Sequence, residues 1–246
     1  MRGACTILNI FYMHCLEDGL KSLPGCFSVH EHLNNPALIC PLCGVARARA
    51  IRLGEGARLY AEQSMGDCIY VVRSGVIMES IVGADGQGVV VRLVTRGGAT
   101  GLAALLGDAH RSTATVMEAA DLCRIPVADL NALRVDFPET YIALLKLWHA
   151  ALDDSRALIA SFCHGSAQAR LARFLLFRQQ HAGEGGKFRL RRRDVVALLG
   201  ITGVSASRLL GHFKQQAWVV EADRYCKVVN PQALTELTDQ GDHAAT

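Results

Sequence analysis

The sequence predicts an α+β fold in which an antiparallel β-roll, a long helix and a small helical unit follow one another along the chain. Three observations support this prediction. Short β-prone segments separated by glycine turns fill residues 47–122, an amphipathic pattern covers residues 138–163, and two short helices followed by a hairpin fit residues 190–229. With 246 residues, 50% of them hydrophobic, the chain can bury one large core or two small ones.

Residues 47–122 predict the roll. The β-prone segments are 58–60, 69–72, 76–78 and 89–94, and the turns around them contain Gly54–Glu55–Gly56, Gly66–Asp67, Ser74–Gly75, Asp85–Gly86 and Gly97–Gly98. Strands this short and this evenly spaced are typical of a small jelly roll or barrel. Residues 120–126 are expected to close it.

Residues 138–163 form the longest predicted helix. One apolar stripe, stepping by three or four residues as in a coiled-coil seam, contains Tyr141, Leu144, Trp148, Ala151, Ser155, Leu158 and Phe162. A second stripe beside it contains Ile142, Leu145, His149, Leu152 and Ile159. A helix that is apolar on two sides must be covered twice. The roll can cover one side and a second copy of the helix the other, which predicts a homodimer, with a single-chain bundle as the alternative.

The stretch from 190 to 220 predicts two short helices joined by a tight turn. The first helix contains Asp194 and stops at Gly200, where a left-handed residue is favoured. Thr202 or Ser205 can cap the second helix. Such a pair is typical of a helix-turn-helix, whose second helix enters the major groove of DNA. An ordinary helical hairpin with a solvated face is the alternative.

Hydroxyl and basic side chains lie on the predicted outer face of the second helix and just before the first. The residues expected to contact DNA are Arg191, Arg192, Arg193, Thr202, Ser205, Ser207, Arg208 and Lys214. The arginine run and Lys214 suit phosphate groups, whereas Ser205, Ser207 and Arg208 suit base edges. Because the net charge is only +3, this clustering is more informative than the total, and a solvated charge run is the alternative.

The end of the chain predicts a wing. Two β-prone segments on either side of a turn at 222–224 form a hairpin, and a hairpin that follows a helix-turn-helix makes a winged helix. The hairpin can touch neighbouring phosphates. The polar residues after Leu237 predict a frayed tail.

Together these features resemble the cyclic-AMP receptor and fumarate–nitrate regulator (CRP/FNR) transcription factors over residues 47–233. The matching residues are Leu199–Gly200, Ser205, Ser207–Arg208–Leu209–Leu210, Phe213 and Trp218–Val219–Val220. The resemblance implies a Cys-rich arm at 1–46, a sensor roll like a cyclic-nucleotide-binding jelly roll at 47–136, a dimerisation helix at 137–164 and a winged helix-turn-helix DNA-binding domain at 165–246. It also implies double-stranded DNA and RNA polymerase as partners. Val204 stands where the family has a glutamate that reads the operator, so the operator of this protein is expected to differ from the usual sequences of the family.

The resemblance also implies an effector pocket within residues 97–116. In members that bind cyclic AMP, an arginine–serine pair holds the phosphate and a glutamate holds the ribose hydroxyl, and Gly101, Arg111 and Ser112 match this pattern. Leu102 stands at the glutamate position and cannot accept that hydrogen bond, and a buried hydroxyl left unpaired costs about 1–3 kcal/mol. A cyclic-nucleotide-responsive regulator is therefore an alternative function.

Nine cysteines without a signal peptide or membrane span predict reduced thiols in the cytoplasm. The spacing of Cys40 and Cys43 is typical of zinc and iron–sulfur sites. Resemblance to the oxygen sensors of the family implies that Cys26, Cys40, Cys43 and Cys123 hold a 4Fe–4S cluster, although the arm spacings differ. A zinc site, thiols that form disulfides, and simple burial of single cysteines are the alternatives.

These features predict a sequence-specific DNA-binding regulator. Its dimer would bind palindromic operators under the control of a redox, oxygen or small-ligand signal sensed by the N-terminal half. No nucleophile, base and orienting group occur at an informative spacing, so no enzymatic activity is expected. A redox or metal-handling protein without DNA binding is a further alternative.

Overall fold

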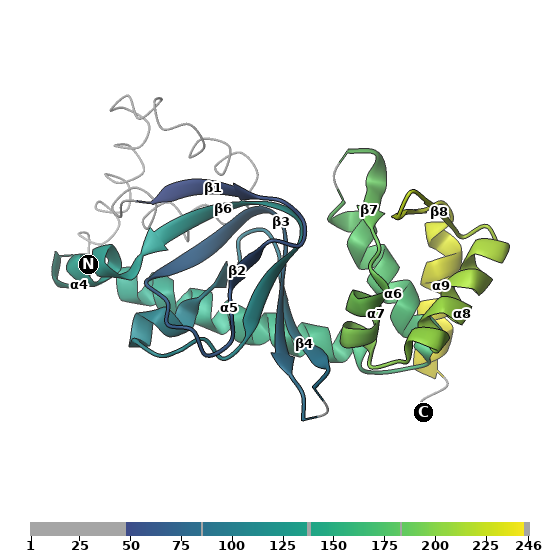
Figure 1. Ribbon diagram of the computed structural model, residues 1–246, viewed down its shortest axis with the longest axis horizontal. Coiled ribbons are helices and arrows are strands. Elements are labelled where there is room, and N and C mark those ends of the chain that lie inside the picture. The colour runs from purple at the N-terminus through teal and green to yellow at the C-terminus, as the bar shows by residue number, and fades with distance from the viewer. Residues whose placement is uncertain (1–47, 85, 137–138, 183, 244–246) are drawn as a thin grey trace, which may run out of the picture.

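A computed structural model describes residues 48–84, 86–136, 139–182 and 184–243. Figure 1 shows a β-roll and a separate helical unit, with the long helix α5 (Glu139–Phe162) running beneath the roll toward the helical unit. The predicted α+β architecture and its order along the chain are confirmed. Within the described ranges, no single helix is long and apolar enough to cross a membrane.

The roll is an antiparallel sheet. Its strands are β1 (Arg49–Leu53), β2 (Arg58–Tyr60), β3 (Cys68–Val82), β4 (Gly88–Val94), β5 (Ala99–Thr100) and β6 (Thr113–Pro126). They are ordered β1-β6-β3-β4, with β2 paired to β6 and β5 paired to β3. The short helix η3 (Leu102–Leu106) follows β5. The central pair, β3 and β6, alternates side chains toward a buried interior, where Val72, Ile77 and Leu122 are fully shielded.

The prediction of a turn at Ser74–Gly75 is wrong. Both residues lie inside β3, where the pairing with β6 shifts register and forms a bulge. Gly75 has a φ of +85°, and a Cβ there would collide with the carbonyl oxygen of Ala119. A glycine is therefore needed because the backbone bends and approaches β6 closely, not because the strand ends.

Helix α5 follows α4 (Val127–Asp136) and covers the roll with one side only. Leu147, Leu158 and Phe162 are buried, and Leu144 and Ala151 are partly buried against the core of the roll. The exposed side contains Tyr141, Ile142, Leu145, Trp148, Leu152 and Ile159. The predicted seam is thus only partly right, because its Leu158 and Phe162 pack inward, whereas the second stripe is exposed.

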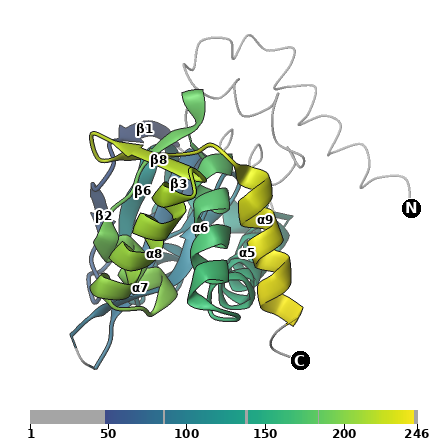
Figure 2. The same ribbon diagram turned by 90° about the vertical axis from the view of Figure 1, so that its right-hand side faces the viewer.

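The helical unit contains α6 (Ala167–Gln180), η4 (Glu184–Gly186), β7 (Lys187–Arg189), α7 (Arg192–Leu199), α8 (Gly203–Gln215), β8 (Val219–Ala222), β9 (Tyr225–Val228) and α9 (Pro231–His243). Three strands, ordered β7-β9-β8, form the wing sheet, so β7 adds a strand that the sequence did not predict. In the end-on view of Figure 2, α7 and α8 face the viewer in front of the roll.

The frayed tail expected after Leu237 is wrong, because α9 continues to His243. The side-chain oxygen of Asn230 accepts a hydrogen bond from the backbone N–H of Ala233, 3.1 Å away, which caps the start of the helix. Leu234 is fully buried, and α9 packs against α6. Tertiary packing of one apolar face therefore stabilises this polar helix.

Candidate functional site

Helices α7 and α8 form the predicted helix-turn-helix. Gly200 has a left-handed φ of 60° and its N–H donates to the carbonyl oxygen of Val196, 3.0 Å away. The two helix axes are bent by 109°, which lies in the range of this motif. A guanidinium nitrogen of Arg170 in α6 donates to the carbonyl oxygen of Leu199 at 2.6 Å, so a residue outside the motif fixes the end of α7.

Thr202, one of the predicted DNA-contact residues, caps the N-terminus of α8 by accepting a hydrogen bond from another, Ser205. The backbone N–H of Ser205 donates to Oγ1 of Thr202 at 3.1 Å, and the two hydroxyls lie 3.0 Å apart. Ala206, Leu210 and Phe213 are buried beneath the helix. Ser207 and Arg208 are exposed, as is Val204 at 71%. The outer face of α8 is therefore open for contact, with Thr202 and Ser205 held in the cap.

Two of the predicted phosphate contacts share one carboxylate. Nζ of Lys214 lies 3.0 Å from Oε2 of Glu221 in β8, and a guanidinium nitrogen of Arg192 lies 3.2 Å from the same oxygen. Although partial burial acts in the opposite direction, the hydrogen bonds from Lys214 and Arg192 lower the pKa of Glu221, which is ionised at neutral pH. Glu221 thus ties the wing to both helices and offsets one of the two positive charges.

The remaining arginines of the basic run point elsewhere. Arg193 is 72% exposed, with Nε 3.5 Å from Asp194. Arg191, at the N-cap of α7, turns toward the roll, where its Nη2 lies 3.6 Å from Oε1 of Glu55. An open cavity of about 620 Å³ lies at this junction, lined by Glu55, Gly56, Arg189, Arg191, Arg192 and Arg193. The three predicted arginines are therefore neighbours with different partners.

A second cavity of about 280 Å³ lies between the roll and α5. Its lining is Tyr60, Glu79, Arg92, Gly101, Leu102, Ala103, His110, Arg111, Ser112, Trp148, Ala151, Leu152 and Ser155. Gly101, Arg111 and Ser112, the predicted effector-pocket residues, all lie in this lining. Because Trp148 and Leu152 of α5 line the cavity, a ligand bound there would contact the long helix. Both residues also belong to the exposed side of α5.

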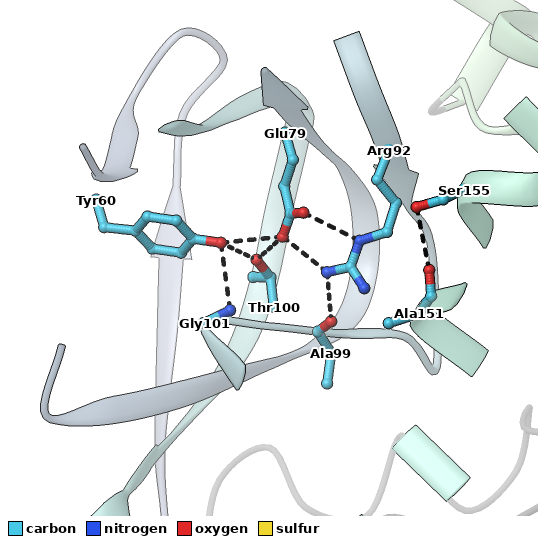
Figure 3. Close-up of polar contacts among 8 residues, drawn as sticks. All are labelled: Tyr60, Glu79, Arg92, Ala99, Thr100, Gly101, Ala151 and Ser155. Carbon is cyan, nitrogen blue, oxygen red and sulfur yellow. Dashed lines mark hydrogen bonds and ion pairs between the residues drawn. The ribbon is translucent and has the colours of Figure 1, made fainter. Parts of the chain in front are cut away.

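Figure 3 shows that the floor of this cavity is a closed polar network. Arg92 and Glu79 are buried cross-strand partners, with Nη2 of Arg92 2.7 Å from Oε1 of Glu79 and 2.7 Å from the carbonyl oxygen of Ala99. The hydroxyls of Tyr60 and Thr100 donate to the same carboxylate. Each charged group thus has partners on several sides, as buried charges require.

The network also engages the backbone amide expected to face a ligand. The N–H of Gly101 donates to the Tyr60 hydroxyl at 3.2 Å. His110 is 3% exposed and stacks on Tyr60 with ring centroids 3.8 Å apart, and burial lowers the pKa of its imidazole, which is neutral at neutral pH. An anion in this cavity would meet Arg111 and Ser112 at the rim and would compete with Tyr60 for the Gly101 amide.

Of the four predicted cluster cysteines, only Cys123 lies in the described residues; Cys26, Cys40 and Cys43 lie outside them. Cys123 is 7% exposed in β6, within an apolar cluster that includes Ile69 and Leu147. Its Cα partner on β1 is Ala50. Among the described residues, no three histidine, cysteine or acidic side chains are grouped so as to hold a metal ion. The described part of the chain therefore contributes one of the four predicted cluster thiols, and its own residues form no metal site.

Glu79, Arg92 and Glu221 are among the site residues that the sequence did not predict. Glu79 and Arg92 stand as single charges in otherwise apolar strand segments, which is a usable signal for a buried pair. Glu221 gave no such signal, because an isolated glutamate in a hairpin is usually solvated. Its role depends on the packing of the wing against α7 and α8.

The comparisons with known proteins agree with this architecture. Residues 50–136 match the model of the cyclic nucleotide-binding domain family, and residues 169–237 match the Crp-like helix-turn-helix domain. The fumarate and nitrate reduction regulatory protein of Vibrio cholerae is 28% identical over 96% of this chain and 92% of that protein, and its Escherichia coli counterpart is 25% identical over 96% and 92%.

Solved structures show the same fold. A CRP-family transcriptional regulator from Thermus thermophilus has a TM-score of 0.67 at 20% identity, covering 77% of this chain and 96% of that one. FixK2 from Bradyrhizobium japonicum has a TM-score of 0.64 at 21% identity, with coverage of 77% and 96%. Because the two family models and the relatives agree with the helix-turn-helix geometry, the chain belongs to the CRP/FNR family of DNA-binding transcription regulators and is not an enzyme.

Proposed function

We propose that this regulator binds palindromic operators as a homodimer, with α8 of each copy in the major groove, under the control of a signal sensed by its N-terminal half. The observation that supports this proposal most directly is the open outer face of α8, where Ser207 and Arg208 are exposed beside the wing. The signal is a redox change, oxygen or a small ligand. RNA polymerase is the expected protein partner and the cytoplasm the expected location.

The proposed division of labour follows the elements. We assign residues 1–46, which lie outside the described residues, to a Cys-rich arm, 47–136 to the sensor, 137–164 to the dimerisation helix and 165–246 to the DNA-binding domain. The exposed apolar side of α5 supports the dimer, because Ile142, Leu145 and Ile159 are each more than half exposed in the single chain. A second copy of α5 would cover this side and hold the two α8 helices one DNA turn apart, about 34 Å.

Base reading and phosphate binding use different residues in this proposal. Arg208 can donate two hydrogen bonds to O6 and N7 of guanine, and Ser207 can reach a neighbouring base edge. Val204 offers a methyl contact to thymine but no acceptor for cytosine. Arg191, Arg192, Arg193 and Lys214 contact phosphates, and Thr202 and Ser205 support the start of α8, where backbone amides face the DNA.

Two routes can carry the signal to α5. A small ligand in the 280 Å³ cavity would touch Arg111, Ser112 and the α5 residue Trp148. A nucleotide is disfavoured there, because Leu102 cannot accept from a ribose hydroxyl and Tyr60 already occupies the Gly101 amide.

The second route starts at Cys123, which shares an apolar cluster with Leu130 of α4 and Leu147 of α5. A cluster here would need Cys26, Cys40 and Cys43 as well, since a 4Fe–4S cluster takes four thiolates. Anaerobic purification followed by iron and sulfide analysis tests this route. About four irons per chain, lost in Cys123→Ser, support the cluster, whereas iron-free wild-type protein contradicts it.

The proposed operator is tested by selecting sites from random duplex DNA at low ionic strength and measuring affinity by fluorescence anisotropy. We expect a palindrome with half-sites about ten base pairs apart and two chains per site. Selection without any common sequence, or one chain per site, contradicts the proposal.

A further inference from the structure

Two ion pairs join the roll to the winged helix, and DNA binding as described above uses neither. In the first, Nη2 of Arg178 in α6 lies 2.5 Å from Oε2 of Glu118 in β6. In the second, Nη2 of Arg191 lies 3.6 Å from Oε1 of Glu55, in the turn between β1 and β2. Both carboxylates belong to the roll and both guanidinium groups to the helical unit.

The Arg178 pair is tight but not fully satisfied. The Arg178 side chain is fully buried, with its guanidinium carbon 5.1 Å from the centre of the Phe188 ring. Its Nε and Nη1 have no hydrogen-bond partner among the described atoms. The cation–π contact compensates only partly for the lost water. Buried donors without partners are destabilising, so these two nitrogens favour an arrangement of the junction in which water reaches them.

The ion pair between Arg191 and Glu55 is longer than that of Arg178, and it depends on the absence of a side chain at Gly56. A Cβ on Gly56 would lie 2.7 Å from Nη2 of Arg191, so the guanidinium rests against the bare backbone of the turn. At 3.6 Å the contact with Glu55 is an ion pair without a hydrogen bond. Burial raises the pKa of the Glu55 carboxyl, and the nearby carboxylate of Glu118 adds to this shift, whereas the attraction of Arg191 opposes it.

The two carboxylates sit on one rigid part of the roll. The N–H of Gly56 donates to the carbonyl oxygen of Val116 at 2.8 Å, and the N–H of Val116 donates to the carbonyl oxygen of Ala57 at 2.8 Å. Glu118 follows two residues later on the same strand, β6, which also carries Cys123. A displacement of β6 would therefore move both carboxylates together relative to α6 and α7.

We propose that Glu118–Arg178 and Glu55–Arg191 form an autoinhibitory latch, which holds the winged helix against the roll and withholds Arg191 from the DNA backbone. In the closed arrangement the Arg191 side chain is only 16% exposed, with its guanidinium against Glu55 and Gly56. A phosphate can reach it fully only when this contact opens, so closing the latch weakens DNA binding and DNA favours the open state. The proposal rests on the proposed role of Arg191 as a phosphate contact. Beyond that role, the proposal identifies Glu55 of the roll as the group that competes with phosphate for Arg191.

The test uses the full-length chain with Glu55→Gln, a substitution in a partly exposed turn. We expect Glu55→Gln to tighten DNA binding roughly two- to five-fold, the range for a weak ion pair. Asp108→Asn removes one charge from an exposed turn of the roll away from this junction and controls for general electrostatics. In an Arg191→Gln background, Glu55→Gln should have no effect, because the two residues act as one unit.

A measurement without DNA separates the latch from the proposed function. Amide hydrogen exchange at Gly56 and at the start of α7 should be faster in Glu55→Gln than in wild type and unchanged in Asp108→Asn. If wild type does not bind DNA but this exchange difference appears, the proposed function fails and the autoinhibitory role fails with it, whereas the contact between the roll and the winged helix is supported. The latch is overturned if Glu55→Gln matches Asp108→Asn in both assays, or if its effect on affinity persists without Arg191.

Discussion

The junction between Glu118 and Arg178 yields a prediction about stability that depends on which partner is removed. Arg178 is fully buried, whereas the side chain of Glu118 is 17% exposed. Glu118→Ala leaves a buried guanidinium without its partner, which should cost about 3–5 kcal/mol. Arg178→Met leaves a carboxylate that water can still reach and removes two unpaired donors, so its cost should be smaller, about 1–3 kcal/mol.

The double variant should lose much less unfolding free energy than the two single variants lose together. Replacing a buried ion pair by apolar groups is often close to neutral, so Arg178→Met with Glu118→Ala should lie within about 1 kcal/mol of wild type. The coupling energy of the cycle would then be about 3 kcal/mol or more. This expectation follows from the desolvation of Arg178, not from the strength of the ion pair.

The assay is urea denaturation followed by tryptophan fluorescence. Trp218 packs 5.3 Å from Phe213 in the winged helix and reports on that unit, and Trp148→Phe removes the signal from α5. All four proteins of the cycle are measured in this background. Equal losses in the two single variants, or losses that add in the double variant, would refute the reasoning.

Three further predictions concern DNA binding, assembly and pH. Arg208→Ala should weaken binding to the selected operator by about 1–3 kcal/mol and relax the sequence preference at one base pair. Lys214→Ala should lower the slope of log affinity against log salt concentration by up to about 0.9 and leave the sequence preference unchanged. Both are measured by fluorescence anisotropy at several salt concentrations, and an equal loss of affinity on all DNA sequences for Arg208→Ala contradicts its assignment to base reading. Leu152→Glu on the exposed side of α5 should yield monomers in sedimentation experiments, and Lys146→Glu on the same helix should not; a dimeric Leu152→Glu variant would exclude this face as the interface. Burial raises the pKa of the Asp194 carboxyl above its ordinary 3.8, so at pH values between 3.8 and this raised pKa the folded state binds more protons than the unfolded state. The free energy of unfolding therefore falls as the pH rises between these two values. Asp194→Asn should flatten this part of the curve of unfolding free energy against pH, and an unchanged curve would contradict it.

The local elements were predictable because their signals are local. Gly200 stops α7 in the left-handed conformation, and Thr202 caps α8. Each of these depends on residues within about one helical turn. The same local reasoning failed at Gly75, because a glycine that ends a strand and a glycine that permits a bulge look alike in sequence.

The candidate sites were predictable only in part. The three effector-pocket residues line one cavity, but the buried pair of Glu79 and Arg92 beneath them and the bond from Gly101 to Tyr60 were not predicted. The basic run before α7 was visible in the sequence, yet its members have three different partners. Which of them is free to meet phosphate depends on carboxylates contributed by the roll and the wing.

The sequence by itself determined the order of the elements, the helix-turn-helix and the amphipathic character of α5, because hydrophobic periodicity and capping act over a few residues. Only the tertiary structure decided which side of α5 is exposed and which cations are paired. Glu221 meets Arg192 across 29 residues, and Glu118 meets Arg178 across 60. Contacts of this kind exist only once the roll and the winged helix have packed together, since nothing in the spacing of the charges specifies their partners.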